Sequence, residues 1–314
     1  MTTTKHIIVK GLGSQLGNRL IQLSNFIAFC KENNLAMHYV GFGSYSVFFE
    51  FTDTNTNTIH YQSNKSFGAL RYLNFLLKYP FVKRYFYTEN KIIERMGLMP
   101  SSEISHLVLG TVDGCDIDNE NEPLMIQCHK SKYVIFEGWK YRATKSFDKH
   151  SVEIKRLLSP KETYLTNISS LIEKCKQKGE IIIGVHIRQG DYKTHLNGRF
   201  YYELSKYHLK MNECIKLFSD KKIVFLICSD QVWKESDFQG FNVQLAKGQI
   251  IEDLYSLSKC DYILGAPSTY SAWASFYGNV PLYHIVHQKN EIKSTDFVIF
   301  TQKQFVEYND IYKQ

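Results

Sequence analysis

Short apolar runs alternate with amphipathic stretches through the second half of the chain. Runs rich in β-branched residues, typical of strands covered on both faces, occupy residues 181–185, 222–228, 242–245, 262–264 and 281–285. Stretches with helical periodicity occupy residues 201–217, 252–259 and 270–277, and a short helix is expected near Val232. This alternation predicts βαβ units, which place their strands in a parallel sheet.

The first half follows a looser version of the same plan. Predicted strands occupy residues 6–9, 36–40, 124–128 and 133–136. Predicted helices begin at Leu16 and occupy residues 151–158 and 161–178, with Pro160 between the last two. We therefore expect an α/β protein of two domains with a cleft between them, an N-terminal one over residues 1–155 and a C-terminal one over residues 156–314. The last helix is left free to pack back on the first domain.

A glycine-rich loop joins the first predicted strand to the first predicted helix. It contains Gly11, Gly13 and Gly17, followed by Asn18 and Arg19. Backbone N–H groups and the helix dipole make such a junction suitable for an anion. The dinucleotide-binding fingerprint fits poorly, because the third glycine comes one residue late and no acidic residue ends the next strand. An NAD site is therefore not the favoured interpretation.

A segment of different composition follows in the first half. Residues 41–66 are rich in Gly, Ser, Thr and Asn and predict a long loop, whereas residues 67–87 are aromatic and basic. The favoured interpretation of residues 67–87 is an ordinary amphipathic helix that buries its Leu and Phe side chains. The alternative is a basic interfacial helix over residues 68–87 that contacts anionic lipid.

Composition and charge limit the function classes. The 314 residues carry a formal net charge of +7, a mild bias that favours anionic ligands, and no basic block or nucleic-acid motif is present. The seven cysteines are scattered without a C-x-x-C pair, which argues against a disulfide framework or a zinc site. Because no signal peptide or long apolar span is recognisable, we expect a cytoplasmic protein, at most peripheral at the inner face of the membrane.

Polar residues gather at the predicted strand ends of the second half. His186, Arg188 and Asp191 follow the apolar run at 181–185, and His186 and Arg188 project to one face in strand phase. An imidazole and a guanidinium together offer donors that suit a phosphate oxygen. The bland alternative is a strand that ends in an ordinary surface salt bridge.

Two further polar groups lie near later strand ends. Asp253 is suited to accept hydrogen bonds from the edge of a base, and Ser268 and Thr269 open a helix whose N-terminus suits phosphate. Taken singly, Asp253 and Ser268 are equally well explained by helix capping. Together with Arg188 they predict a site for a nucleoside diphosphate.

Other site signatures are missing from the sequence. It contains no P-loop, no G-x-S-x-G elbow, no H-E-x-x-H pair and no Asp-x-Asp metal clamp. We therefore expect Arg188 and helix ends, rather than a metal ion, to meet the pyrophosphate charge.

Three segments in chain order resemble the alpha-1,2-fucosyltransferases of glycosyltransferase family 11. Residues 184–192, with the sequence GVHIRQGDY, resemble the His-x-Arg-Arg-Gly-Asp-Tyr signature of that family. Residues 15–22 resemble its N-terminal Gly-Leu-Gly-Asn element. Residues 253–261, followed by residues 268–273, resemble its C-terminal Asp-Leu and Ser-Thr-Phe-Ser-Trp-Trp element.

The resemblance implies a GT-B fold of two Rossmann-like domains that face each other across a cleft. It implies an inverting, metal-independent transfer of L-fucose from GDP-fucose to a glycan hydroxyl, through an α-1,2 linkage, in bacterial surface polysaccharide assembly. The acceptor would be a glycan or a lipid-linked oligosaccharide. By position, Arg188 would bind the β-phosphate, Asp253 would accept from guanine, and Asn18 and Arg19 would approach from the N-terminal domain. The implied donor-binding set is Gly17, Asn18, Arg19, His186, Arg188, Asp253, Ser268, Thr269 and Tyr270.

The chain departs from the family pattern at two motif residues. Gln189 stands in place of the second Arg of the signature, and Ala272 in place of the first Trp of the last element. The missing charge leaves open another nucleotide-sugar donor, or a catalytically silent nucleotide- or glycan-binding protein of the same fold. Residues 193–202 differ as well, which leaves open an acceptor other than the usual galactoside.

The reaction also needs a group that takes the proton of the acceptor hydroxyl. Asp191 is the candidate base by its position beside Arg188. Glu137 and Glu203 are the alternatives.

Overall fold

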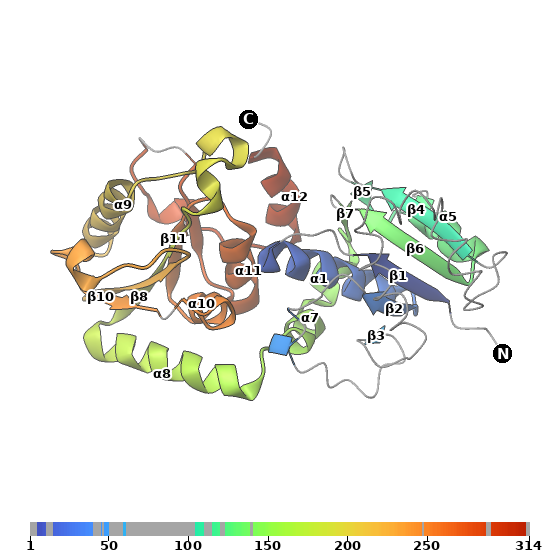
Figure 1. Cartoon of the computed structure of the whole chain (residues 1–314), viewed down its shortest axis with the longest axis horizontal. Coiled ribbons are helices and arrows are strands. Elements are labelled where there is room, and N and C mark those ends of the chain that lie inside the picture. The colour runs from blue at the N-terminus through green and yellow to red at the C-terminus, as the bar shows by residue number, and fades with distance from the viewer. Residues whose placement is uncertain are drawn as a thin grey trace, which may run out of the picture. The chain divides into compact units, whose positions relative to one another are not determined.

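The chain forms two compact units, Met1–Ser159 and Pro160–Gln314, and each is described by itself (Figure 1). The computed structural model describes residues 5–10, 15–39, 45, 47–49, 59–60, 104–109, 115–119, 123–138, 141–246, 248–286 and 290–311. Three predicted features lie outside these residues: the glycine loop at 11–14, most of the loop at 41–66, and the segment 67–87.

The first unit is built on a five-stranded parallel sheet. Its strands are β1 (His6–Lys10), β2 (Ala36–Tyr39), β3 (Ile59–His60), β4 (Ile104–Leu109) and β6 (Tyr133–Gly138), in the order β3-β2-β1-β6-β4. A separate parallel pair is formed by β5 (Cys115–Asp116) and β7 (Tyr141–Arg142). The helices described in this unit are α1 (Leu16–Glu32), α5 (Pro123–Lys130), α6 (Ser146–Lys149) and α7 (Ser151–Leu157).

The strand predicted at residues 124–128 is wrong, because this segment is the helix α5. Leu124 and Cys128 are buried and Ile126 is exposed, which is the burial expected for one face of a helix. Pro123 opens the helix, a position where its missing N–H costs nothing. An apolar run of this length does not by itself distinguish a strand from the buried face of a short helix.

The second unit contains the parallel sheet that the sequence predicts. Its strands are β8 (Ile181–Ile187), β9 (Ile223–Ser229), β10 (Val243–Leu245), β11 (Tyr262–Gly265) and β12 (Leu282–His284), in the order β10-β9-β8-β11-β12. Its α-helices are α8 (Glu162–Lys178), α9 (Leu204–Leu217), α10 (Ile250–Leu257), α11 (Thr269–Gly278) and α12 (Gln302–Ile311). Four short 3-10 helices are η3 (Asp191–Lys193), η4 (His195–Gly198), η5 (Glu235–Phe238) and η6 (Ser294–Asp296). The short helix expected near Val232 is the 3-10 helix η5, which begins at Glu235, and Val232 itself lies in the loop before it.

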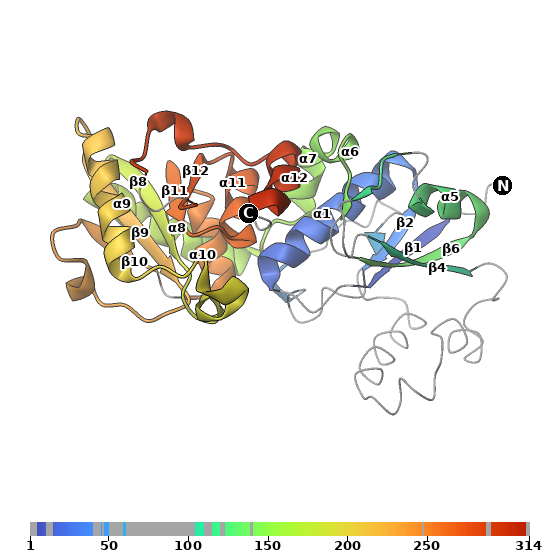
Figure 2. The ribbon, with the colours of Figure 1, turned by 90° about the horizontal axis from the view of Figure 1, so that it is seen from above.

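Helices cover both faces of this sheet, with α9 on one side and α8 and α10 on the other (Figures 1 and 2). Ile183 and Ile187 of β8 belong to the same buried cluster as Met211 of α9. On the opposite face, a Cβ at Gly184 would lie 2.5 Å from the Leu257 side chain, so the glycine permits the close approach of α10. Burial on both faces explains why residues 181–187 are almost continuously apolar.

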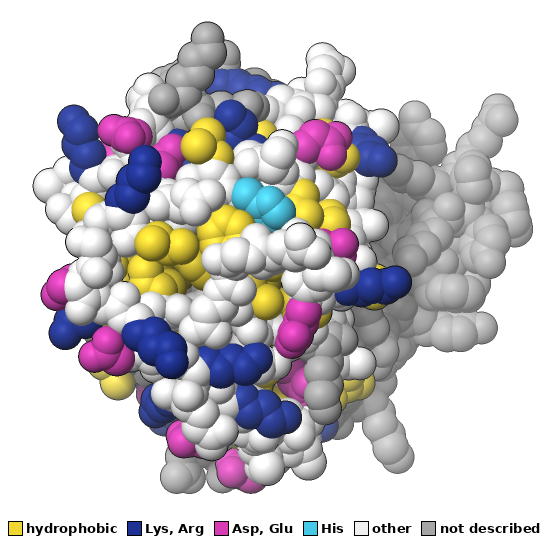
Figure 3. Space-filling view, turned by 90° about the vertical axis from the view of Figure 1, so that its left-hand side faces the viewer, with side chains coloured by type: hydrophobic (Ala, Val, Ile, Leu, Met, Phe, Trp, Pro, Cys, Tyr) yellow, Lys and Arg dark blue, Asp and Glu magenta, His cyan; other side chains and the backbone are white. Residues whose placement is uncertain are grey.

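Figure 3 looks onto the side of the molecule that carries α9 and β10. Apolar side chains gather in its centre, and basic and acidic side chains are interspersed around them. Leu209 of α9 and Val232 are among the exposed apolar residues of the second unit.

Within the described part of the chain, no helix combines the length and the apolar character needed to cross a membrane.

Candidate active site

The strand order of the second unit creates a switch point between β8 and β11. From β8 the chain continues to β9 and β10 on one side, and it then passes through α10 to β11 and β12 on the other side. Ligands of open α/β sheets bind beyond the carboxyl ends of the strands at such a point. The polar residues predicted in this half lie on the connections that meet there. His186 lies in β8 and Arg188 directly follows it, Ser268 follows β11, and Asp253 lies in the first turn of α10.

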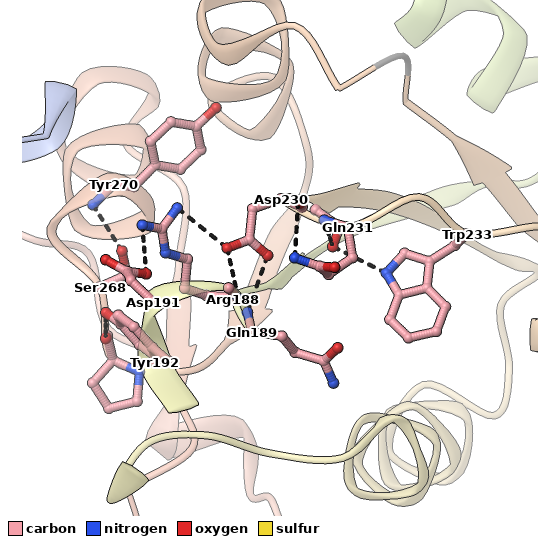
Figure 4. A network of polar contacts seen from close by, with 12 residues as sticks. Arg188, Gln189, Asp191, Tyr192, Asp230, Gln231, Trp233, Ser268 and Tyr270 are labelled. Carbon is pink, nitrogen blue, oxygen red and sulfur yellow. Dashed lines mark hydrogen bonds and ion pairs between the residues drawn. The ribbon is translucent and has the colours of Figure 1, made fainter. Parts of the chain in front are cut away.

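The Arg188 side chain lies between two carboxylates (Figure 4). Its Nη2 atom is 2.7 Å from Oδ1 of Asp191, and its Nη1 atom is 3.5 Å from Oδ2 of Asp230. The guanidinium carbon also lies 5.6 Å from the centre of the Tyr192 ring. Asp191 makes the shorter of the two contacts, but its side chain is 50% exposed. Because it is accessible, an incoming anion can take its place on Arg188.

Asp230 belongs to the site, although the sequence does not mark it as a site residue. It follows β9, and its carboxylate accepts the backbone N–H of Gln189 on Oδ1 and that of Gly190 on Oδ2, each at 3.0 Å. These bonds fix the turn from which Arg188 projects. The available signal was a Ser-Asp pair at the end of the strand that pairs with β8, and the sequence does not reveal that pairing.

Gln189, which replaces the second Arg of the family signature, points away from the guanidinium of Arg188 (Figure 4). Its side chain is buried, and its Nε2 donates to the carbonyl oxygen of Tyr202 at 2.8 Å. In this structure the residue therefore joins two parts of the connection between β8 and α9. A neutral amide suits this buried place better than a charged side chain.

The N-terminus of α11 lies at the same edge of the sheet. Ser268 is its N-cap, and the Ser268 hydroxyl oxygen accepts the backbone N–H of Tyr270 at 3.2 Å. The Tyr192 hydroxyl donates to the carbonyl oxygen of Pro267 at 2.6 Å and so connects the loop after β8 to the loop after β11. Thr269 is the first helical residue. A helix N-terminus with a hydroxyl cap beside an arginine is suited to a phosphate group.

Two histidines, the buried His186 and the partly buried His284, lie in a row across the switch point. His186 of β8 is the register partner of Gly265, which in turn pairs with His284 of β12. A Cβ at Gly265 would lie 2.7 Å from the His186 carbonyl oxygen, so the glycine lets β11 approach. The His186 ring stacks on Tyr270 at 4.9 Å between ring centres.

Both imidazoles are neutral at physiological pH. Burial lowers the pKa of His186 to about 3, and the nearby Arg188 adds to the effect. Burial likewise lowers the pKa of His284 to about 3, with His186 adding to it. Because the Ser271 hydroxyl donates to the Ser268 carbonyl, it accepts from Nε2 of His284 at 3.0 Å. Among the described residues, Nδ1 of His186 is buried without a hydrogen-bond partner.

Asp253 is a buried carboxylate with unused hydrogen-bonding capacity. Its exposed fraction is 4%, and its Oδ1 atom has no partner among the residues that the structure describes. Burial raises its pKa to about 7, the neighbouring Glu252 adds to the rise, and a hydrogen bond with the Gly248 backbone opposes it. The Tyr270 hydroxyl donates to the Ile250 carbonyl oxygen at 2.6 Å, which joins α10 to α11 beside this carboxylate. A buried acceptor of this kind is costly unless a ligand supplies donors.

The residues predicted on the N-terminal side belong to the first unit. Gly17, Asn18 and Arg19 lie in the first turn of α1, which follows β1. The Arg19 guanidinium carbon lies 5.2 Å from the centre of the Tyr45 ring. The structure thus brings His186, Arg188, Asp191, Asp253, Ser268, Thr269 and Tyr270 together at one sheet edge, and places the other three at the start of α1.

The arrangement in the second unit supplies positive charge, a helix N-terminus and a buried acceptor. Together these suit a ligand that has a phosphate group at one end and an N–H edge at the other. Across the described residues, no group of three or more His, Cys, Asp and Glu side chains is placed to hold a metal ion.

Solved structures share this fold. Arabidopsis thaliana FUT1, a mutant form in complex with GDP, has a TM-score of 0.58 at 14% identity, with 94% of this chain and 74% of that chain covered. NodZ alpha-1,6-fucosyltransferase from Bradyrhizobium, co-crystallised with GDP, has a TM-score of 0.55 at 14% identity, with 90% of this chain and 95% of that chain covered. POFUT1 in complex with GDP-fucose has a TM-score of 0.54 at 10% identity, with 88% of this chain and 95% of that chain covered. The fold is therefore GT-B, which confirms the predicted fold class.

Fold and site together define a GT-B protein with a ligand site at the switch point of its second sheet. Residues 125–295, more than half of the chain, match the model of Glycosyl transferase family 11. The chain belongs to this family and is a glycosyltransferase, which confirms the resemblance seen in the sequence. A search of curated proteins finds no match to the sequence.

Proposed function

We propose that this glycosyltransferase transfers L-fucose from GDP-fucose to a hydroxyl of a glycan acceptor. We further propose an α-1,2 linkage, inversion at the fucose anomeric carbon, no need for a divalent metal, and a role in bacterial surface polysaccharide assembly. Family membership and the three motifs support the class of reaction. NodZ and POFUT1, which share the fold, were solved with GDP or GDP-fucose bound. The linkage, stereochemistry and pathway rest on the sequence motifs alone.

The observation that carries this proposal is the buried carboxylate of Asp253, whose Oδ1 atom has no partner among the residues that the structure describes. Guanine presents neighbouring N–H donors on its base-pairing edge, and a carboxylate can accept from two of them at once. Uracil offers a single ring N–H, and adenine and cytosine offer only an amino group. Asp253 in its ionised form is therefore expected to select GDP over the other nucleoside diphosphates.

Arg188 and the start of α11 are proposed to meet the charge of the departing diphosphate. As the fucosyl bond to the β-phosphate oxygen breaks, negative charge grows on GDP while the sugar ring becomes oxocarbenium-like. Three groups would bind this charge: Arg188, Ser268 and the first N–H groups of α11. Arg188 would exchange its ion pair with Asp191 for one with the diphosphate. His186 would contribute its unpartnered Nδ1 atom. Positive charge from the protein itself is what makes a metal ion unnecessary in this proposal.

The acceptor side of the reaction is proposed to involve the first unit. Gly17, Asn18 and Arg19 would approach the diphosphate and the acceptor, and the acceptor would be a glycan or a lipid-linked oligosaccharide. Asp191 is proposed as the base that removes the acceptor proton. Peripheral membrane contact through residues 68–87 remains a proposal, because that segment lies outside the described residues.

The second candidate is a transferase of the same fold with another nucleotide-sugar donor. The observation that favours it is Gln189, which leaves the signature with one fewer positive charge than the family pattern has. A third candidate, a silent nucleotide- or glycan-binding protein, would bind a nucleotide without turnover.

Thermal-shift measurements with GDP, UDP, ADP and CDP, each with and without EDTA, separate these candidates. We expect GDP alone to stabilise the protein, EDTA to have no effect, and Asp253→Asn to abolish the response. Asp220→Asn, an exposed carboxylate of the same unit, is the matched control. NMR then monitors the hydrolysis of GDP-fucose. This measurement tests turnover and shows which anomer of fucose is released first. Stabilisation by UDP or another nucleotide in place of GDP would replace the proposal with the second candidate, and GDP binding without turnover would favour the third.

A further inference from the structure

The loop of residues 193–199, which follows the signature at the end of β8, carries three basic side chains on an unusual backbone. Lys193, His195 and Arg199 are all exposed. Between them, Leu196 and Asn197 have φ values of 50° and 55°, in the left-handed region that a leucine rarely occupies. Backbone hydrogen bonds from Asn197 to the Thr194 carbonyl and from Arg199 to the Leu196 carbonyl, both at 3.2 Å, accompany this conformation. Strained segments of this kind cluster at functional sites.

This loop is continuous with the candidate donor site. Tyr192, at its start, lies under the Arg188 guanidinium and bonds through its hydroxyl to the Pro267 carbonyl beside α11. Within the loop, the His195 ring stacks on the Tyr192 ring at 5.6 Å between centres. The basic loop is thus two ring contacts away from the arginine proposed to bind the β-phosphate.

Two of the basic groups have no acidic partner among the residues that the structure describes. Lys193 Nζ lies 5.6 Å from the centre of the Tyr201 ring, and the Arg199 guanidinium carbon lies 5.1 Å from that of Phe200. Within the described ranges neither forms an ion pair with a carboxylate, whereas Arg188 has two such partners. A cation that rests on an aromatic ring keeps its N–H groups available for an anion.

We propose that residues 193–199 recognise a negatively charged acceptor glycan, with a carboxylate, phosphate or sulfate group near the hydroxyl that receives the sugar. This inference rests on the proposed function. The diphosphate of the donor is already provided for by Arg188 and the start of α11, so it does not account for two more cations. An anionic group on the acceptor would form charge-assisted hydrogen bonds with Lys193 and Arg199.

Binding of the whole chain, loaded with GDP, to an array of glycans tests the proposal. The array pairs neutral glycans with counterparts of the same core that carry a uronate, sialate, phosphate or sulfate group. Wild type is compared with Lys193→Gln/Arg199→Gln and with Lys216→Gln/Lys221→Gln, which removes the same charge from exposed positions at and just beyond the end of α9. We expect wild type and the control to bind acidic members about tenfold more tightly than their neutral counterparts. The loop variant should show no such preference, and salt should reduce the preference of wild type.

Acceptor-independent hydrolysis of GDP-fucose by the same three proteins separates this inference from the proposed function. Hydrolysis at equal rates is expected, because the loop is assigned to the acceptor. Equal binding of acidic and neutral glycans, binding to no acidic glycan, or a preference retained by the loop variant would overturn the inference while hydrolysis leaves the proposed function standing. Selective binding to anionic lipid vesicles, in place of acidic glycans, would overturn it as well. Absence of both GDP binding and hydrolysis would count against the proposed function itself.

Discussion

The backbone N–H of Gly190 donates to Oδ2 of Asp230 across 3.0 Å, and that oxygen also limits the space at residue 190. A Cβ at Gly190 would lie 2.8 Å from it. Because the same carboxylate accepts from Gln189 and lies 3.5 Å from an Arg188 nitrogen, Asp230 sets both the backbone turn and the side-chain direction of the arginine. It acts as a positioning residue through Arg188.

Asp230→Asn should therefore reduce turnover without abolishing GDP binding. An amide can accept only one of the two backbone N–H groups with its oxygen, and its NH2 group would face the other donor. We expect kcat for GDP-fucose hydrolysis to fall about 10- to 100-fold, as for residues that orient a catalytic group, with a smaller change in KM. Gly190→Ala should act in the same direction, because it displaces the same carboxylate. A variant pair with unchanged kcat would refute the positioning role.

Arg188→Ala should cut turnover by about 100-fold or more while the protein remains folded. The guanidinium is the charged group nearest to the proposed diphosphate, and removal of one such donor typically costs this much. Circular dichroism and the unfolding temperature monitor the fold. Arg156→Ala is the matched control, because Arg156 is an exposed arginine that pairs with Glu153 in the first unit. An Arg188→Ala enzyme with a nearly wild-type rate would remove Arg188 from the phosphate site.

Asp253→Asn should stabilise the free protein above neutral pH. The pKa of Asp253 is about 7 in the folded protein, against an ordinary value of 3.8, because burial disfavours the charge. Between these pH values the folded state holds a proton that the unfolded state has released, so the free energy of unfolding falls as pH rises. The asparagine variant escapes this loss. Its unfolding temperature should exceed that of wild type at pH 8 and match it near pH 4, and equal temperatures at pH 8 would contradict the shift.

GDP binding to wild type should release a proton below about pH 7. Guanine N–H groups require the ionised carboxylate of Asp253, so binding lowers the pKa that burial has raised. Affinity should consequently rise with pH up to neutrality. Calorimetric titration in two buffers of different ionisation enthalpy measures the released proton directly. A binding enthalpy that is the same in both buffers below pH 7 would contradict the prediction.

The sequence predicted the parts of this site that depend on local pattern. The apolar run before His186 and Arg188 predicts a covered strand, and a change to polar residues marks its carboxyl end. Ser268 is followed by a helical stretch, so both its capping role and its place at a strand end could be foreseen. Asp253 could be picked out by its place at the start of a predicted helix and by its resemblance to the family's Asp-Leu element, but its burial could not be foreseen.

The parts that could not be predicted depend on pairing between distant segments. Asp230 meets Gly190 only because β9 lies beside β8, and strand register across 40 residues leaves no local signal. The direction of Gln189 is set by the Tyr202 carbonyl, which lies beyond an irregular loop. The left-handed Leu196 contradicts the preference of its residue type, so no propensity argument could have placed it.

Gln189→Arg should not restore a family-like donor site. The Gln189 side chain is 8% exposed and donates to a backbone carbonyl, so an arginine there must bury a charge or disturb the connection to Tyr202. We expect a loss of about 2–4 kcal/mol in unfolding free energy and no gain in GDP affinity. Gln231→Arg, which introduces the same side chain at an exposed neighbouring position, is the control. Tighter GDP binding by a stable Gln189→Arg protein would show that residue 189 reaches the donor after all.

Asp191→Asn distinguishes the two tasks that Asp191 can have. Its carboxylate pairs with Arg188 at 2.7 Å in the structure, where it competes with an incoming phosphate, and it is also the proposed base. Removal of the competing charge should let GDP bind somewhat more tightly, by about threefold. Loss of the base should lower sugar transfer to the acceptor by about 100-fold or more. Tighter GDP binding with undiminished transfer would leave Asp191 as a partner of Arg188 only and assign the proton to another group. Glu203, exposed at the N-cap of α9, is then the next residue to replace.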